Sequence, residues 1–364
     1  MPLSDNCKTF LSLVRLGIGH EVEELPGQID WPRMKALAAE QGLSAIMFDG
    51  AGELNNRSLL NEGRSMDSKL KKQWIGIVIQ GHENKYADYR TRIGQLAYFY
   101  NEHGFKLMVL KGYGLSLNYP IPSHRPVGDI DIWAFGRYKE ADAALNKEFG
   151  IQIDNSHHHH TVFNFMDYPV ENHYDWVNVH AHKSSAEIEK IFKDMAMDDS
   201  YWTEIDDQRV YLPSPNLHAL FLLRHSMSHF ASTSMNLRQF LDWAFFVEKH
   251  TGEIDWKWLL ETLGRFKMTD FFMCLNVICV RYLGFDSGIF PPIKVDSALS
   301  TRILADTLAP EFSETSPKGF LSRVTFKYHR WRANNWKQRL CYPESSLQTF
   351  LSGLWNHLLK PSSI

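Results

Sequence analysis

Two carboxylates spaced two residues apart are the clearest chemical feature of this sequence. Asp129 and Asp131 alternate with Ile130 and Ile132 in a short apolar run that predicts a β-strand. Successive strand side chains point to opposite faces, so the two acids share one face and the two isoleucines share the other. Like charges side by side repel each other, and carboxylate oxygens suit Mg²⁺ or Mn²⁺. The spacing therefore predicts a metal site at Asp129 and Asp131.

A glycine-containing turn precedes this strand. The apolar run Phe105 to Leu110 predicts a strand, and Lys111, Gly112 and Gly114 follow it directly. Glycine lets a phosphate approach the backbone, and a short helix predicted over 115–119 would add free N–H donors. A phosphate-binding turn and a two-carboxylate metal site are the parts needed to activate a nucleoside triphosphate.

Two cations flank these parts. Lys111 offers a point charge and Arg125 a planar fork, and both suit phosphate. Arg125 lies four residues before Asp129, in a proline-rich loop that could carry it toward a triphosphate. The alternative for Arg125 is an exposed loop residue without a ligand.

Taken together, these residues resemble a known family. Leu-Lys-Gly at 110–112, then Arg125, then Gly-Asp-Ile-Asp-Ile at 128–132 is similar to the uncharacterised nucleotidyltransferase family of the polymerase-beta-like superfamily. The resemblance is strongest over about 109–133 and weaker over 174–182 and 220–243. It implies a nucleoside triphosphate substrate, Mg²⁺ (or Mn²⁺) as cofactor, and transfer of a nucleoside monophosphate to an acceptor hydroxyl.

The resemblance also implies a third carboxylate on a later strand, and the sequence departs from it there. In the strand predicted over Trp176 to His182, the matching position is Asn178, two residues before His180. An amide can give a metal one oxygen but cannot act as a base. The departure puts turnover in question and leaves nucleotide binding unaffected. Glu171 and Asp175 are nearby acids that could substitute.

Histidines supply further candidates, each with a structural role as its alternative. His180 shares the predicted face of Asn178 and could bind phosphate or act as a base near neutral pH. The resemblance matches His160, the last residue of the tract His157 to His160, to a histidine before an apolar pair; the tract itself predicts adventitious metal binding. His225 and His229 lie one turn apart on a predicted helix, without a zinc-protease signature.

The elements around these residues predict an α+β fold: a small mixed-sheet nucleotidyltransferase core flanked by N-terminal and C-terminal helical lobes. The boundaries are residues 1–104 for the N-terminal helical region, 105–212 for the core and 213–364 for the C-terminal helical region. Within the last, Arg238 and Asp242 are one helical turn apart, which predicts an ion pair between them. Further predicted strands cover 161–165 and 210–212, and predicted helices cover 10–18, 31–40, 68–103, 137–149, 185–197, 216–230, 237–250, 256–263, 270–283, 298–308 and two more within 317–360.

Composition narrows the class of protein. The 364 residues carry a net charge of −3, so no overall positive field draws nucleic acid. The four cysteines are scattered without zinc spacing, which favours a reduced, cytoplasmic protein. No apolar run approaches the length of a membrane span.

Three functions remain open at this point. The first is a nucleotidyltransferase in which Asp129 and Asp131 hold the metal. The second is a non-catalytic nucleotide-binding or regulatory module on the same fold, suggested by Asn178. The third and weakest is a metal-dependent hydrolase built on the histidines. The acceptor is undetermined: a small molecule, sugar, protein or RNA would each fit.

Overall fold

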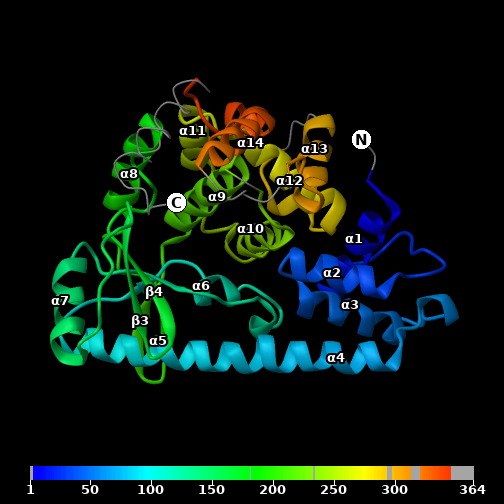
Figure 1. Ribbon diagram of the computed structural model, residues 1–364, viewed down its shortest axis with the longest axis horizontal. Helices are drawn as coiled ribbons and strands as arrows, with labels where there is room; N and C mark the ends of the chain where they lie inside the picture. Colours follow the sequence, from blue (N-terminus) through cyan, green and yellow to red (C-terminus); the bar gives the residue numbers. More distant parts are fainter. Residues whose placement is uncertain (1–2, 181, 233, 293–296, 313–319, 346–364) are drawn as a thin grey trace.

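A six-stranded mixed sheet organises the middle of the chain, and helices from both ends of the sequence cover it (Figure 1). The computed structural model describes residues 3–180, 182–232, 234–292, 297–312 and 320–345. The helices are α1 (Asp5–Gly17), α2 (Trp31–Glu40), α3 (Ser44–Asn56), α4 (Ser68–Val78), α5 (Lys85–Glu102), α6 (Tyr113–Ser116), α7 (Tyr138–Phe149), α8 (Lys183–Met195), α9 (Pro215–Ser232), α10 (Leu237–His250), α11 (Trp256–Arg265), α12 (Thr269–Leu283), α13 (Ser297–Leu308) and α14 (Phe320–Cys341).

The sheet confirms the predicted α+β class. Its strands are β1 (Met108–Val109), β2 (Ile130–Trp133), β3 (His160–Phe165), β4 (Tyr168–His173), β5 (Trp202–Ile205) and β6 (Gln208–Tyr211). They lie in the order β3-β4-β2-β1-β6-β5. The central strand β2 pairs antiparallel with β1 and parallel with β4, so the sheet is mixed.

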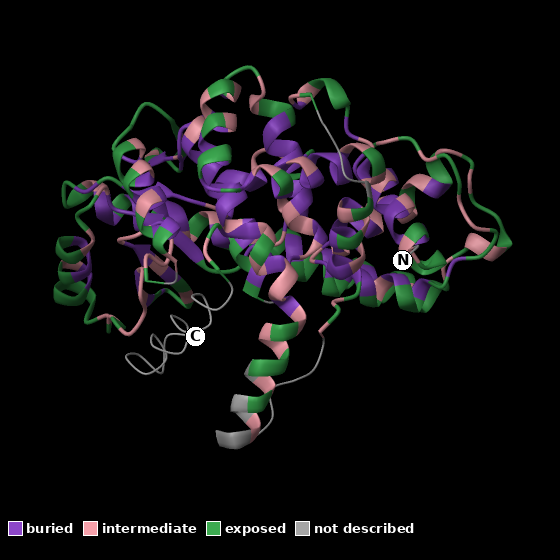
Figure 2. Ribbon diagram, turned by 90° about the horizontal axis from the view of Figure 1, so that it is seen from above, coloured by how far each residue is buried: buried purple, intermediate pink, exposed green. Residues whose placement is uncertain are grey.

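The two faces of β2 meet different layers. Ile130 and Ile132 are fully buried in a core that they share with residues of α5 and α7. Trp133 points the other way, into the larger core that includes α9, α10 and α12. Because side chains alternate along a strand, Asp131 also lies on the α9 side of the sheet. The buried residues gather along the sheet and the helices beside it (Figure 2).

One long helical rod runs beneath the molecule in Figure 1. Helices α4 and α5 are continuous through a π-helical segment, Ile79–Asn84, as the predicted helix over 68–103 requires. The rod ends against the sheet, where Tyr89 of α5 is completely buried. Helix α5 thus brings Tyr89, from the predicted N-terminal helical region, into the same core as β2, the strand that carries Asp131.

Most predicted helices are confirmed, and their ends follow the expected capping chemistry. The Asp30 carboxylate accepts a hydrogen bond from the Arg33 backbone N–H at 3.1 Å, and Gly42 with φ of +67° follows the end of α2. Asp255 caps α11 in the same way. Of the two helices predicted over 317–360, α14 is present; residues 346–364 lie outside the described part of the chain.

Two hairpins were not predicted from the sequence. Strands β3 and β4 are joined by Met166 and Asp167, with φ of +47° and +70°; strands β5 and β6 are joined by Asp206 and Asp207, with φ of +51° and +62°. Two central residues with positive φ make the tight turn that suits strand twist. Neither turn contains the glycine that usually reveals such a connection, so β4 and β5 stayed hidden.

The strand predicted over Trp176 to His182 is wrong. The described residues 174–180 form bends and a turn after β4. Instead of a neighbouring strand, the Glu189 carboxylate of α8 accepts the backbone N–H groups of Trp176 and Val177, at 3.0 to 3.1 Å. A buried carboxylate therefore satisfies donors that a sheet would otherwise pair.

Helices from the two ends of the chain share one core. Helix α1 packs against α3 and also against α12. Nδ1 of His20, just after α1, lies 2.7 Å from the carbonyl oxygen of Leu283 at the end of α12. Among the described residues, no helix combines the length and the apolar character that crossing a membrane requires.

Candidate functional site

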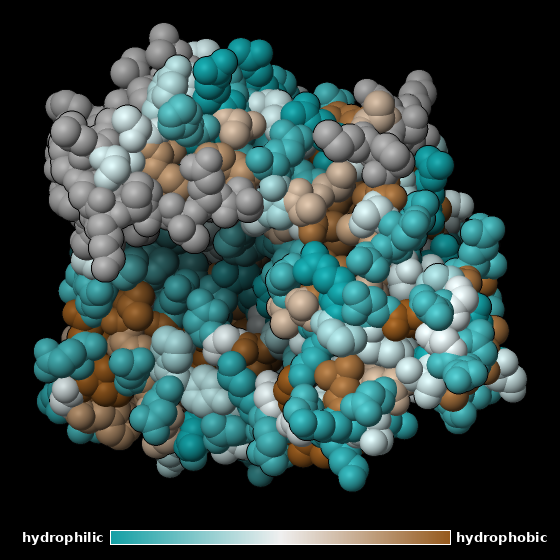
Figure 3. All heavy atoms as spheres, turned by 45° about the vertical axis from the view of Figure 1, so that its right-hand side comes forward, coloured by the Kyte–Doolittle hydropathy of each residue, from teal (hydrophilic) through white to brown (hydrophobic). Residues whose placement is uncertain are grey.

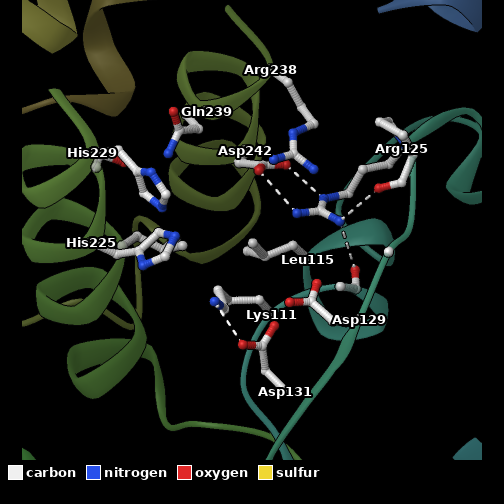
Figure 4. Close-up of a pocket in the computed structure, with 15 residues that line it drawn as sticks. Lys111, Leu115, Arg125, Asp129, Asp131, His225, His229, Arg238, Gln239 and Asp242 are labelled. Atoms are coloured by element: carbon white, nitrogen blue, oxygen red, sulfur yellow. Dashed lines mark hydrogen bonds and ion pairs between the residues drawn. The ribbon is translucent and has the colours of Figure 1, made fainter. Parts of the chain in front are cut away.

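A polar cavity of about 230 Å³ lies between the sheet and helices α9 and α10. Asp129 and Asp131 line its sheet side, together with Lys111 and Gly112. The helix side is formed mainly by His225, Ser226, His229, Arg238, Gln239 and Asp242. Figure 4 shows the two carboxylates beside Lys111 and facing this helical wall. The molecular face in Figure 3 has a recess whose visible interior is mainly hydrophilic.

Asp131 is the buried centre of the site. It is 4% exposed, and its Oδ1 lies 2.7 Å from Lys111 Nζ and 3.2 Å from His173 Nε2. Burial opposes ionisation, but Lys111 and His173 outweigh it and hold the pKa of Asp131 well below its usual range. Asp131 is therefore an anion with two positive partners.

Asp129 has the opposite electrostatic character. It lies immediately before β2 and is exposed, so it is outside the strand although it lines the same cavity as Asp131. Loss of hydration at the cavity, then repulsion from Asp131 and Glu171, raise the pKa of Asp129. An added cation would relieve this repulsion.

The acid next to Asp131 is Glu171, not Asn178. Strand β4 runs parallel to β2 with Glu171 opposite Asp131, and directly paired residues present their side chains on the same face. Oxygens of Asp131 and Glu171 and a nitrogen of His173 all lie within 4.8 Å of one another. Of the two substitutes that the sequence offered, the structure brings Glu171 to the site.

His173 links these two carboxylates and was not found from the sequence. Its Nε2 lies 3.2 Å from Asp131 and 3.5 Å from Glu171. Burial alone would lower the pKa of His173, but the two carboxylates raise it to about 9. The alternating pattern of β4 would have revealed Glu171 and His173 together if the preceding hairpin had been recognised.

Gly112 makes the turn that the sequence predicted, for a reason that involves Tyr89. Its φ is +51°, and a Cβ atom there would lie 2.2 Å from the Tyr89 hydroxyl oxygen. That hydroxyl donates a hydrogen bond to the Asp129 carbonyl oxygen at 3.0 Å. Tyr89 therefore joins the glycine turn to the start of β2. Gly114 packs against Leu212 and does not line the cavity.

Arg125 is buried, unlike the exposed loop residue that the sequence left as an alternative. It clamps the Gly112 turn to α10. Its guanidinium binds the Asp242 carboxylate through two bonds of 2.7 and 3.0 Å and donates to the Gly112 carbonyl oxygen at 3.2 Å. The Tyr119 hydroxyl donates to the same carboxylate at 2.7 Å. These contacts fix the Gly112 turn against α10. Phosphate contact by Arg125 remains a prediction.

The predicted ion pair between Arg238 and Asp242 is wrong, because Arg125 occupies the Asp242 carboxylate. Arg238 lines the cavity, has no ion pair among the described residues, and its Nε is buried without a hydrogen-bond partner there. Figure 4 shows its guanidinium above the cavity, opposite the carboxylates. Arg238 thus supplies the uncommitted cation that Arg125 was expected to be.

His225 and His229 face the carboxylates from α9. Their rings lie 4.5 Å apart, and both line the cavity. Burial, followed by the charge of Lys111, lowers the pKa of both imidazoles. Both rings are therefore neutral near pH 7 and can accept a proton.

The remaining predicted site residues lie elsewhere. Asn178 Oδ1 accepts the backbone N–H of His180 at 3.0 Å, which is a local turn contact. Neither Asn178 nor His180 is among the described residues that line the cavity. His160 lies on β3, 3.8 Å from Glu171, and burial followed by repulsion from His173 lowers its pKa to about 4.

Comparisons with known proteins place these residues within a matched region. The model of a family described as "Uncharacterised nucleotidyltransferase" matches residues 27–284, more than half of the chain. No curated protein matches it. The chain is similar to the crystal structure of an antigenic nucleotidyltransferase-like protein from Paracoccidioides brasiliensis, at 13% identity and a TM-score of 0.35, over 57% of this chain and 98% of that one.

Proposed function

Because the chain belongs to the uncharacterised nucleotidyltransferase family, we propose that its cavity binds a nucleoside triphosphate with Mg²⁺ and transfers a nucleoside monophosphate to an acceptor hydroxyl. The observation that carries the proposal is the cluster of acidic side chains on the α9 side of the sheet. Asp131 and Glu171 lie opposite each other on parallel strands, and Asp131 and Asp129 line the cavity.

The donor atoms fit a divalent cation. Asp131 already binds one positive group, Lys111 Nζ, at 2.7 Å, so the site stabilises positive charge at that position. Asp129, Asp131 and Glu171 would hold Mg²⁺ or Mn²⁺ through carboxylate oxygens, the ligand type that these ions prefer. The ion's contribution when bound is to neutralise phosphate charge and polarise the phosphoryl group.

Two cations would bind the phosphates. Lys111 lies at the carboxylates, and Arg238 approaches from α10 with its guanidinium uncommitted. A guanidinium can bind two phosphate oxygens at once. The Gly112 turn, held by Arg125 and packed against Tyr89, lines the same cavity and would present its backbone to the phosphates.

The acceptor would enter beside α9. The imidazoles of His225 and His229 are neutral at pH 7, so either can take the proton of an acceptor hydroxyl. A second cavity of about 500 Å³ shares His225, His229, Arg238 and Gln239 with the first. Its size favours a small-molecule acceptor, or one group of a larger one.

The non-catalytic alternative loses the observation that suggested it. It depended on Asn178 at the position of the third acid, and Glu171 lies beside Asp131 instead. The hydrolase hypothesis had joined the histidine-rich strands to His225 and His229. Only the latter pair lines the cavity.

The test is binding and turnover of labelled triphosphates with Mg²⁺ or Mn²⁺. We expect metal-dependent binding by calorimetry and pyrophosphate release on addition of cell extract as acceptor. Asp131→Asn should remove both, and Glu204→Gln, an exposed acid on the edge strand β5, should change neither. Binding without pyrophosphate release would favour the non-catalytic module. Absence of metal-dependent binding would contradict the proposal.

A further inference from the structure

Three histidines come together where β3 begins and β4 ends. His160 and His173 pair across the two strands with rings 5.1 Å apart, and the His159 ring lies 4.3 Å from that of His160. One nitrogen of each ring lies within 4.8 Å of one nitrogen of each of the others. His173 is outside the histidine tract and reaches it only because β4 folds back on β3.

Two of these imidazoles have unused nitrogen atoms. His160 is 6% exposed, and neither of its ring nitrogens has a hydrogen-bond partner in the described part of the chain. Nδ1 of His159 is also buried without one. Buried polar atoms are nearly always partnered, and an exception in a native fold points to an ion or water. An ion between the rings would satisfy Nδ1 of His159 and one of the two nitrogens of His160.

His173 and Glu171 are placed to complete this group. Nδ1 of His173 lies 3.2 Å from the carbonyl oxygen of Asp175, and this contact fixes the ring. Nε2, which lies 3.2 Å from Asp131 Oδ1, is the atom that would bind a metal after losing its proton. Glu171 lies 3.8 Å from Nε2 of His160 and 3.5 Å from Nε2 of His173. A single carboxylate therefore faces two of the three rings.

We propose that His159, His160 and His173, with Glu171 as fourth ligand, form a site for a transition-metal ion such as Zn²⁺. Imidazole nitrogens favour Zn²⁺, Co²⁺ and Ni²⁺, whereas Mg²⁺ takes oxygen ligands. Three imidazoles and one carboxylate supply the four ligands of tetrahedral zinc. The site is held mainly by β3 and β4 and shares Glu171 with the proposed Mg²⁺ site, so Zn²⁺ binding is measured without nucleotide and its outcome is separate from that of the triphosphate assay.

The test uses the full chain after treatment with a chelator. Zn²⁺ binding is measured by calorimetry, and the visible absorption of bound Co²⁺ reports the coordination geometry. We expect one tightly bound ion per chain and a tetrahedral Co²⁺ spectrum. His159→Gln and His173→Gln should each weaken Zn²⁺ binding by about 100-fold or more, because even outer-sphere partners contribute roughly 10- to 100-fold.

The matched control separates this site from tag-like binding by the tract. The double variant His157→Gln/His158→Gln keeps His159, His160 and His173, so its Zn²⁺ affinity should stay near that of the wild type. If that variant loses affinity and His173→Gln does not, the tract alone binds the ion and the proposal is wrong. If His173→Gln fails to fold, the same measurement is made on His159→Gln, at a half-buried position, and on Glu171→Gln. A Zn²⁺ affinity near that of the wild type in both variants would contradict the proposal.

Discussion

Lys111 and His173 keep Asp131 ionised, and Glu171 lies opposite it on the neighbouring strand. Glu171 can therefore be tested as the third acid. We predict that Glu171→Gln reduces metal-dependent triphosphate transfer by on the order of 10²-fold or more, the scale of a lost catalytic group. Its melting temperature without metal should be unchanged or lower, because burial and the repulsion from Asp131 are outweighed by the contact with His173, which holds the pKa of Glu171 below its usual value. The measurement is pyrophosphate release, with calorimetry for binding.

Asn178 provides the comparison. Its side chain contacts the backbone of His180, away from the carboxylates. Asn178→Asp should therefore leave transfer at the wild-type rate. If Asn178 instead stood at the position of the third acid, the new carboxylate would raise the rate. A large rate increase in Asn178→Asp, together with an active Glu171→Gln enzyme, would return the role to Asn178.

His173 predicts how stability depends on pH. Its folded-state pKa of about 9 is above the usual 6.5, so its contribution is complete below about pH 6.5 and is lost as pH rises through 9. At about 1.4 kcal/mol per pKa unit, the free energy of unfolding should fall by up to about 3 kcal/mol over this range. Chemical denaturation at a series of pH values measures it, and His173→Gln should flatten the decline.

His218 is the matched control for this pH profile. It is equally buried, but burial, then repulsion from His250, lowers its pKa to about 3. Its contribution is therefore present above pH 6.5 and lost as the pH falls. His218→Gln should alter the acidic side of the profile and leave the alkaline decline in place. An alkaline decline that survives in His173→Gln would contradict the assignment.

At the scale of elements, the turn between β1 and α6 is fixed by contacts from α5 and α10. We predict that Gly112→Ala destabilises the protein by about 2–4 kcal/mol, through backbone strain and overlap with Tyr89. Thermal or urea unfolding measures the loss. Gly128→Ala is the control, because a Cβ there meets nothing within 4 Å and its φ is not positive.

The clamp between Arg125 and α10 makes a second prediction at this scale. Asp242→Asn leaves the Arg125 charge buried without its partner, which should cost about 3–5 kcal/mol of unfolding free energy. Glu311→Gln breaks the exposed pair with Arg302, which has similar distances of 2.8 and 3.0 Å, and should cost only about 0–1 kcal/mol. Equal losses in urea unfolding would show that the burial of the clamp does not matter.

The sequence predicted elements well where local chemistry determines them. Helix periodicity and caps such as Asp30 and Asp255 gave most helices, and the acid-apolar alternation of 129–133 gave β2. Hairpins turned by Asp167 and by Asp206 with Asp207 lack glycine, so β4 and β5 were missed. Without β4 there was no way to place Glu171 beside Asp131.

Side-chain partners were predicted less well, because long-range contacts compete with local ones. One helical turn suggested that Asp242 would bind Arg238, but the distant Arg125 offers a bidentate, buried pair instead. Because Arg125 occupies the Asp242 carboxylate, Arg238 lines the cavity without an ion pair among the described residues. Glu189 similarly accepts the N–H groups of residues that had been predicted to form a strand.

At the scale of the whole molecule, the shared core of α1, α3 and α12 predicts joint unfolding of the two ends of the chain. Phe10 of α1 is fully buried, and Phe10→Ala should cost about 3–5 kcal/mol. Hydrogen exchange should then show lower protection in α12 as well as in α3. Loss confined to α1–α3 would indicate that the ends are separate units.

The packing of α1 against α12 also has a consequence for synthesis. A ribosome adds about 5–20 residues per second, so the 266 residues from Gly17 to Leu283 take roughly 13–53 s. Throughout that interval α1, whose Phe10, Leu13 and Val14 are buried in the shared core, lacks its contact with α12. Until α12 is synthesised, the nascent chain therefore exposes apolar surface of α1, and holdase chaperones should bind it there.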